Sequence, residues 1–135
     1  MMYYFRIPGE PTGKARPRVV RGHSYTPEKT VLYENLVKTC YRGPVYIGPV
    51  EVQITACFQV PKSVSASKRE RMLSGEIPPV KRPDCDNIGK IICDALNYTA
   101  YGDDAQVVRL SVRKVWGTVG EVQVGIREWG GDEDA

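Results

Sequence analysis

Residues 84–104 read DCDNIGKIICDALNYTAYGDD and hold five of the chain's seven aspartates, with a single lysine, Lys90, among them. Asp86, Lys90 and Asp94 are spaced by four residues, so on a helix their side chains lie in one row. Apolar residues recur with helical spacing and indicate the buried face of that helix: Ile88, Ile91, Ile92, Ala95 and Leu96. Crowded carboxylates repel one another unless a cation lies between them, so the stretch predicts a divalent-metal site.

Further acidic residues flank this predicted helix on both sides. If residues 84–86 are extended, Asp84 points the same way as Asp86 and joins the row. Asp103 and Asp104 come immediately before a predicted strand, so we expect the carboxylate of Asp104 to face the row at the helix start. The alternating pattern of that strand, over 108–116, is repeated over 122–126 beyond a turn bounded by glycines, which predicts a terminal β-hairpin.

Alternation and capping signals define the remaining elements. Alternating apolar residues predict a short first strand over 3–7 and a half-buried strand over 50–60. Thr26 as the N-cap and Pro27 as the first helical residue predict a helix whose buried stripe consists of Leu32, Leu36 and Cys40. Ser67 and Glu70 form a capping-box pattern for a short basic helix. Together these segments predict an α+β fold with about four strands.

Length and composition limit the class of protein. The 135 residues fit one domain, 1–129, followed by a flexible acidic tail over 130–135. The N-terminus has no apolar run typical of a signal peptide, and no stretch reaches the ~18 apolar residues of a membrane span, so we expect a cytoplasmic location. The four cysteines form no CxxC pair, and we expect reduced, mostly buried thiols.

Charge is divided unevenly along the chain. Residues 1–83 carry 14 Lys and Arg against 6 Asp and Glu, whereas residues 84–135 carry 5 against 10. Basic side chains with few acids among them suit contact with phosphates. The predicted DNA-binding residues are Lys14, Arg16, Arg18, Arg21, Lys68, Arg69, Arg71, Lys81 and Arg82. An acidic metal site beside such a surface suits an enzyme that cleaves a polyanionic backbone.

Each acidic residue also has an ordinary structural explanation. Asp86 could cap the helix, Lys90 and Asp94 could form an exposed ion pair, and the aspartates at 103–104 could belong to a turn. One metal site explains all the positions together, whereas the structural explanations require several separate coincidences. The role of Asp94 stays open between the two.

The run KRPDCDNIGKIICDALN (81–97), followed by YGDDAQVV (101–108), resembles the signature of the RusA family of Holliday junction resolvases, small phage- and prophage-associated endodeoxyribonucleases. The upstream segments GKARPR and YTPEKT are also similar to that family, so the resemblance covers most of residues 1–116. It implies a single mixed β-sheet flanked by helices, a homodimer, dependence on Mg²⁺ or Mn²⁺, and paired nicks across a four-way DNA junction. Large aromatic residues often dominate interfaces, and the candidate dimer anchors are Trp116, Trp129 and Tyr101.

The resemblance also implies roles for individual residues. Asp84, Asp86 and Asp104 would be the catalytic, metal-binding carboxylates and Lys90 the catalytic lysine, while Asp94 and Asp103 match family positions without an assigned role and are candidates to lie beside the metal ligands. Phosphodiester hydrolysis needs cations to offset charge on the phosphate, which agrees with this set. Three functions therefore remain open: a metal-dependent junction resolvase, a nuclease acting mainly on flaps or other branched DNA, and a non-catalytic DNA-binding protein.

Overall fold

The computed structural model describes residues 1–131, apart from the side chains of Arg18 and Tyr25. Residues 132–135, most of the predicted acidic tail, lie outside the described residues. In chain order the elements are β1 (Tyr3–Pro8), β2 (Arg18–Val20), β3 (His23–Tyr25), α1 (Glu28–Cys40), β4 (Val50–Gln59), α2 (Ala66–Leu73), α3 (Cys85–Ala95), the 3₁₀ turn η1 (Asp104–Gln106), β5 (Val107–Gly117) and β6 (Glu121–Glu128).

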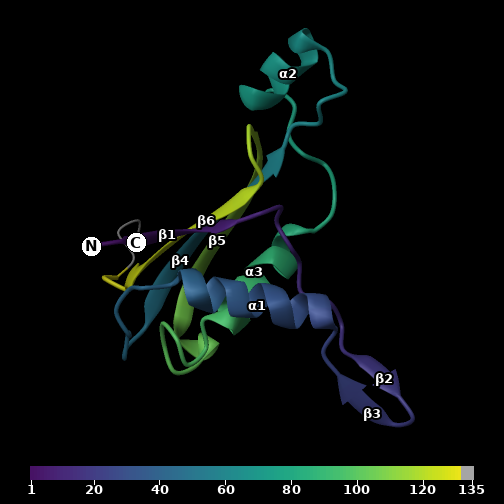
Figure 1. Cartoon of the computed structure of the whole chain (residues 1–135). Helices are drawn as coiled ribbons and strands as arrows, with labels where there is room; N and C mark the ends of the chain where they lie inside the picture. Colours follow the sequence, from purple (N-terminus) through teal and green to yellow (C-terminus); the bar gives the residue numbers. More distant parts are fainter. Residues whose placement is uncertain (132–135) are drawn as a thin grey trace.

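Four strands form one mixed sheet in the order β1-β6-β4-β5 (Figure 1). β4 pairs parallel with β5 and antiparallel with β6, and β6 pairs antiparallel with β1. The predicted α+β class and the mixed sheet of about four strands are confirmed.

The predicted terminal hairpin is wrong, because β5 and β6 do not pair with each other. β4 lies between them, and the chain passes over the end of β4 in the short turn after Gly117. There the backbone N–H of Val60 donates to the carbonyl of Gly117 at 3.0 Å. The alternating pattern identified both strands, but it carries no information about which strand lies next to which.

Helix α3 packs beside α1 against the sheet, close to β5 (Figure 1). Its predicted apolar face is confirmed, since the five residues of that face have no exposed surface: Ile88, Ile91, Ile92, Ala95 and Leu96. Gly89 lets the helix approach β5 closely. A Cβ atom on Gly89 would lie 3.0 Å from Leu110 Cδ2 and 3.2 Å from Val112 Cγ2, tighter than ordinary van der Waals contact.

The predicted stripe and N-cap of α1 need correction. The N-cap is Pro27, one residue later than expected, and the buried residues are Thr30, Tyr33 and Val37. Leu32 is 60% exposed, although Leu36 packs partly against the core with Cys40. Two neighbouring apolar rows lie about 100° apart on this helix, and only the position of the sheet decides which row is buried.

Helix α2 also begins earlier than its sequence pattern suggested. Its N-cap is Ser65, whose side-chain oxygen accepts a hydrogen bond from the backbone N–H of Lys68 at 3.2 Å. The segment that carries α2 and the β2–β3 hairpin both extend away from the sheet (Figure 1).

No helix of the described residues has the length and apolar character needed to cross a bilayer. All four cysteines are free: Cys57 and Cys93 are buried, Cys40 is half-buried, and Cys85 is the exposed exception to the predicted burial.

The corrected stripe of α1 predicts a large loss of stability for one truncation and a small one for another. Val37→Ala should lower the free energy of unfolding by about 2 kcal/mol, because it removes two fully buried methyl groups. Leu32→Ala should change it by less than about 0.5 kcal/mol, since that side chain is mostly in solvent. Urea unfolding followed by circular dichroism measures both, and a larger loss for Leu32→Ala would contradict the packing described above.

Candidate functional site

Asp84 and Asp86 lie at the start of α3. Asp84 is the N-cap residue with extended backbone, and Asp86 lies in the first turn, so the chain is helical from Cys85 rather than extended to Asp86 as expected. Both residues are exposed, and the Asp84 side chain makes no capping hydrogen bond. The positive end of the helix dipole stabilises the negative charge of these two carboxylates. Because both side chains are exposed, their oxygens are available to a cation.

Lys114, in the C-terminal half of β5, binds the backbone of the segment that leads into α3. Its ammonium donates to the carbonyl of Lys81 and, at 3.2 Å, to that of Pro83. The ammonium also lies 5.6 Å from the ring centroid of Phe58. Asp84, the next residue after Pro83, is therefore held near the C-terminal half of β5.

Asp104 lies at the opposite end of β5, in the turn that precedes this strand. Partial burial raises its pKa, and the neighbouring carboxylates of Asp103 and Asp94 raise it further. The end of α3, where Asp94 lies, therefore faces Asp104. This corrects the expectation that Asp104 faces the helix start.

The three predicted metal ligands do not meet within one chain. Asp86 precedes Asp94 by eight residues of α3, a separation of about 12 Å along the helix axis. From Val107 to Lys114, β5 spans about 23 Å. Within residues 1–131, no three His, Cys, Asp or Glu side chains lie close enough to hold one metal ion. The donors suit Mg²⁺, which prefers carboxylate oxygens, but each end of α3 offers only part of the set.

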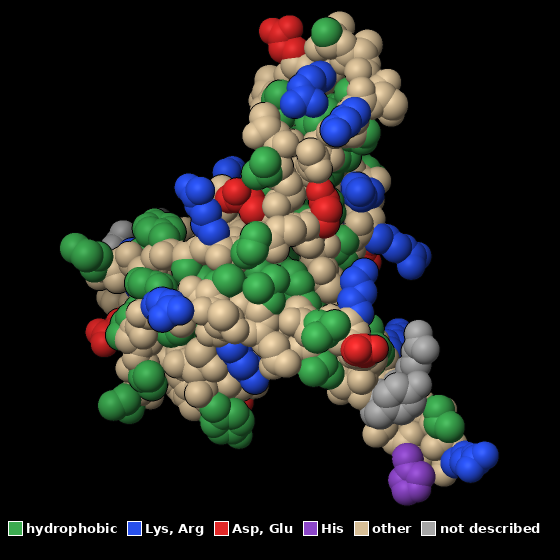
Figure 2. Space-filling model, viewed as in Figure 1, with side chains coloured by type: hydrophobic (Ala, Val, Ile, Leu, Met, Phe, Trp, Pro, Cys, Tyr) green, Lys and Arg blue, Asp and Glu red, His purple; other side chains and the backbone are tan. Residues whose placement is uncertain are grey.

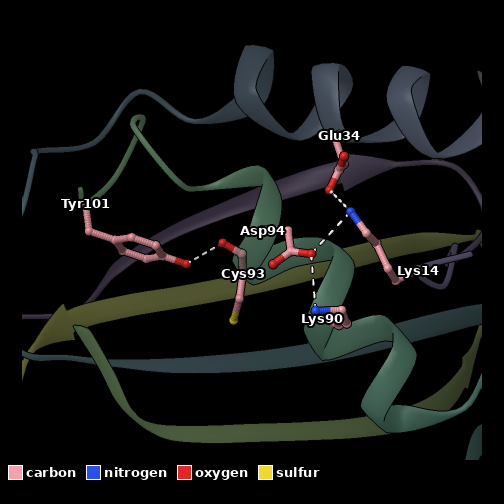
Figure 3. Close-up of polar contacts among 6 residues, drawn as sticks. All are labelled: Lys14, Glu34, Lys90, Cys93, Asp94 and Tyr101. Atoms are coloured by element: carbon pink, nitrogen blue, oxygen red, sulfur yellow. Dashed lines mark hydrogen bonds and ion pairs between the residues drawn. The ribbon is translucent and has the colours of Figure 1, made fainter. Parts of the chain in front are cut away.

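Asp94 is the centre of a network of charged side chains (Figure 3). Its Oδ2 lies 3.2 Å from Lys14 Nζ and 3.6 Å from Lys90 Nζ, so the ion pair considered for Lys90 and Asp94 is present. Lys14 also donates to Glu34 Oε2 at 2.9 Å. Burial by itself would lower the pKa of Lys14, but the hydrogen bonds and charges of Glu34 and Asp94 outweigh it and raise that pKa. Glu34 was not identified from the sequence, where it is one of two acidic residues on α1.

Gln106 fixes the turn that carries Asp104. Its Oε1 accepts hydrogen bonds from the backbone N–H groups of Gly102, at 2.9 Å, and Asp103, at 3.2 Å. Its Nε2 donates to the carbonyls of three consecutive residues, 46–48, at 3.0, 3.2 and 2.9 Å. The glutamine of the DDAQVV run was visible in the sequence, but its role as an anchor depends on the distant 46–48 loop.

The loop after α3 is held by Tyr101, which was proposed above as a dimer anchor. Tyr101 has no exposed surface, and its hydroxyl donates to the carbonyl of Cys93 at 2.7 Å. The anchor proposal is wrong for this residue, because it already packs inside its own chain. Trp116 is half-buried against Phe58, with ring centroids 6.3 Å apart, and Trp129 is also half-buried.

The basic side chains predicted to contact DNA occupy three places. Lys68, Arg69 and Arg71 lie on α2, Lys81 and Arg82 lie just before α3, and the others lie in the N-terminal segment and its hairpin. In Figure 2, Lys and Arg side chains follow the side of the molecule that runs from the α2 segment to the hairpin. The side chain of Arg18 lies outside the described residues. Lys14 differs from the rest because its ammonium is turned inward to two carboxylates.

Comparisons with known proteins agree with the pattern of residues. The family model described as "Endodeoxyribonuclease RusA" matches residues 8–127. The chain is also 38% identical over 134 residues to the uncharacterized protein YqaN of Bacillus subtilis (strain 168), an alignment that covers 92% of this chain and 94% of that protein.

Truncating Gln106 should release the turn that carries Asp104. We expect Gln106→Ala to lower the free energy of unfolding by about 1–2 kcal/mol, because five backbone groups, one of them partly buried, lose a hydrogen-bond partner. Amide hydrogen exchange at Gly102 and Asp103 should become faster. Gln123→Ala, on the exposed side of β6, is the matched control and should cost less than about 0.5 kcal/mol. Unchanged exchange at Gly102 would mean that the turn does not depend on Gln106.

Proposed function

Because the chain belongs to the RusA family of endodeoxyribonucleases, we propose that it resolves four-way DNA junctions as a Mg²⁺-dependent homodimer. Each copy would hydrolyse one phosphodiester bond, and two copies related by a twofold axis would cut two strands of a junction that has the same symmetry. Mn²⁺ is the alternative cation. The observation that carries the proposal is the concentration of carboxylates at both ends of α3, with the exposed basic residues Lys81 and Arg82 directly before the start of that helix.

Asp84, Asp86 and Asp104 are the proposed ligands of the cation. When bound, Mg²⁺ would offset the charge that builds on the scissile phosphate and lower the pKa of an attacking water. Lys90 extends from the exposed side of α3, one turn after Asp86, with 61% of its side chain in solvent. We assign to it the stabilisation of negative charge on the phosphate in the transition state. The basic residues on α2 and before α3 would position the duplex arms by contact with phosphates.

A second copy would complete the site that one chain leaves divided. β5 is one of the two edge strands of the sheet, and its side chains Val108 and Leu110 are 54% and 46% exposed. Antiparallel pairing of two β5 edges would place the start of one strand opposite the end of the other. Asp104 of one copy would then approach Asp84 and Asp86 of its partner, because these residues flank opposite ends of β5. Val108 and Leu110 replace the large aromatic residues as the proposed apolar contact.

Cleavage of defined DNA substrates tests the function. With Mg²⁺, we expect the protein to nick a synthetic four-way junction in two strands and to leave flap and duplex DNA intact. Asp86→Asn should abolish cleavage while junction affinity stays the same or improves, since a carboxylate that repels DNA has been removed. Preferred cleavage of flaps would favour the broader branched-DNA nuclease, and binding without any cleavage would favour a DNA-binding protein.

Mixing two inactive variants tests the divided site. Asp86→Asn and Asp104→Asn should each be inactive alone. In a mixed dimer, one site would contain both substitutions, and the other would contain neither. Co-refolded mixtures should therefore recover single-strand nicking at up to about a quarter of the wild-type rate, because about half of randomly formed dimers are mixed and each has one intact site. A mixture as inactive as its components would place all the ligands of a site in one chain.

A further inference from the structure

Two lysines share one oxygen of Asp94, and they differ in how firmly they are held. Lys14 Nζ lies 3.2 Å from Asp94 Oδ2 and 2.9 Å from Glu34 Oε2, with 19% of its side chain exposed (Figure 3). Lys90 Nζ lies 3.6 Å from the same oxygen, and 61% of its side chain is exposed. Lys14 is therefore the tighter partner of Asp94, and Lys90 is the looser and more exposed one.

The backbone around Lys14 is also fixed against α3. The N–H of Lys14 donates to the carbonyl of Asn87 at 2.9 Å. A Cβ atom on Gly13 would lie 2.7 Å from Cβ of Pro83 and 3.1 Å from Cβ of Asn87, so a glycine is needed for the chain to lie this close. Lys14 is thus attached near the start of α3, and its side chain reaches along the helix to Asp94 near its end. Both its main chain and its ammonium are held in place.

We propose that Lys14 is a positioning residue for Lys90: with Glu34 holding its ammonium, Lys14 offsets part of the charge of Asp94 and so weakens the ion pair that Lys90 must leave to contact the scissile phosphate. The inference rests on the role proposed above for Lys90. Without Lys14, Asp94 would have Lys90 as its nearest cation, and the two would form a stronger ion pair on the helix surface. Lys90 would then have to break that pair before it could reach a phosphate.

The same geometry argues against Lys14 as a phosphate contact, the role that its sequence context suggested. Its ammonium already has two carboxylate partners and little exposed surface, so a phosphate would have to displace one of them. Arg16, two residues later, is exposed and serves as the matched control for a phosphate contact in the same segment.

A double-mutant cycle between Lys14 and Asp94 tests the proposal. Lys14→Met keeps the apolar stem and should slow single-turnover junction cleavage roughly three- to tenfold, the effect of one competing ion pair of intermediate exposure. In an Asp94→Asn background the same substitution should have no effect on the rate, because the competing carboxylate is gone. Equal slowing by Lys14→Met in both backgrounds would overturn the proposal.

A second readout does not depend on cleavage. In free protein with ¹³C-labelled lysine, NMR relaxation of the Lys90 ε-methylene should show reduced mobility in Lys14→Met and not in Arg16→Met. Arg16→Met should instead flatten the salt dependence of junction binding by about 0.9, the value for one lost phosphate contact. Unchanged mobility of Lys90 in Lys14→Met would overturn the proposal even if Asp94→Asn proved inactive.

The variant Lys90→Ala separates failure of this inference from failure of the proposed function. It should slow cleavage by roughly 10²–10³-fold, as expected for loss of one electrostatic stabiliser. If Lys90→Ala cleaves normally, the assigned role of Lys90 is wrong and the inference is wrong with it. If Lys90→Ala is slow and Lys14→Met cleaves like the wild type, only the inference about Lys14 is wrong.

Discussion

Burial of one face of α3 is the constraint on which the arrangement of the acidic residues depends. Ile88, Ile91 and Ile92 have no exposed surface, and Gly89 brings the helix close to β5. The rise of an 11-residue helix keeps its two ends about 16 Å apart, and this packing fixes where each end lies against β5. The carboxylates that precede the helix and those that face its end are therefore held apart.

Different interactions reduce the electrostatic repulsion among carboxylates at the two ends of α3. At the start, Asp84 and Asp86 are exposed and lie at the positive end of the helix dipole. At the other end, Asp94 and Asp104 are partly buried, where repulsion is stronger because less water screens it. There two lysines neutralise Asp94, whereas Gln106 and Tyr101 hold the turn and the loop by hydrogen bonds to the backbone. The buried end therefore has a fixed framework, and the exposed end has oxygens that are open to solvent.

The sequence predicted the features that depend on local periodicity and missed those that depend on distant contacts. The buried face of α3 and the apolar face of β4 follow from spacing along one segment, and both were correct. The pairing of β5 with β4 instead of β6 depends on the order of strands, which no local pattern contains. For the same reason, Asp104 was placed at the wrong end of α3, and Lys14 was placed on the surface although Glu34 and Asp94 draw it inward. Residue types identified the candidate site, but only the fold showed that it is divided.

A divided site has a consequence for a nuclease that acts on a symmetric substrate. If Asp104 of one copy completes the carboxylates of its partner, a lone chain has no complete set of ligands and cannot nick DNA. Both sites would form in the same event, because a twofold axis creates the two contacts together. The geometry of the dimer interface would then set the distance between the two cut phosphodiester bonds. On this argument the separation of the two ends of α3 would prevent cleavage by a single chain, and pairing of two β5 edges would be the step that allows it.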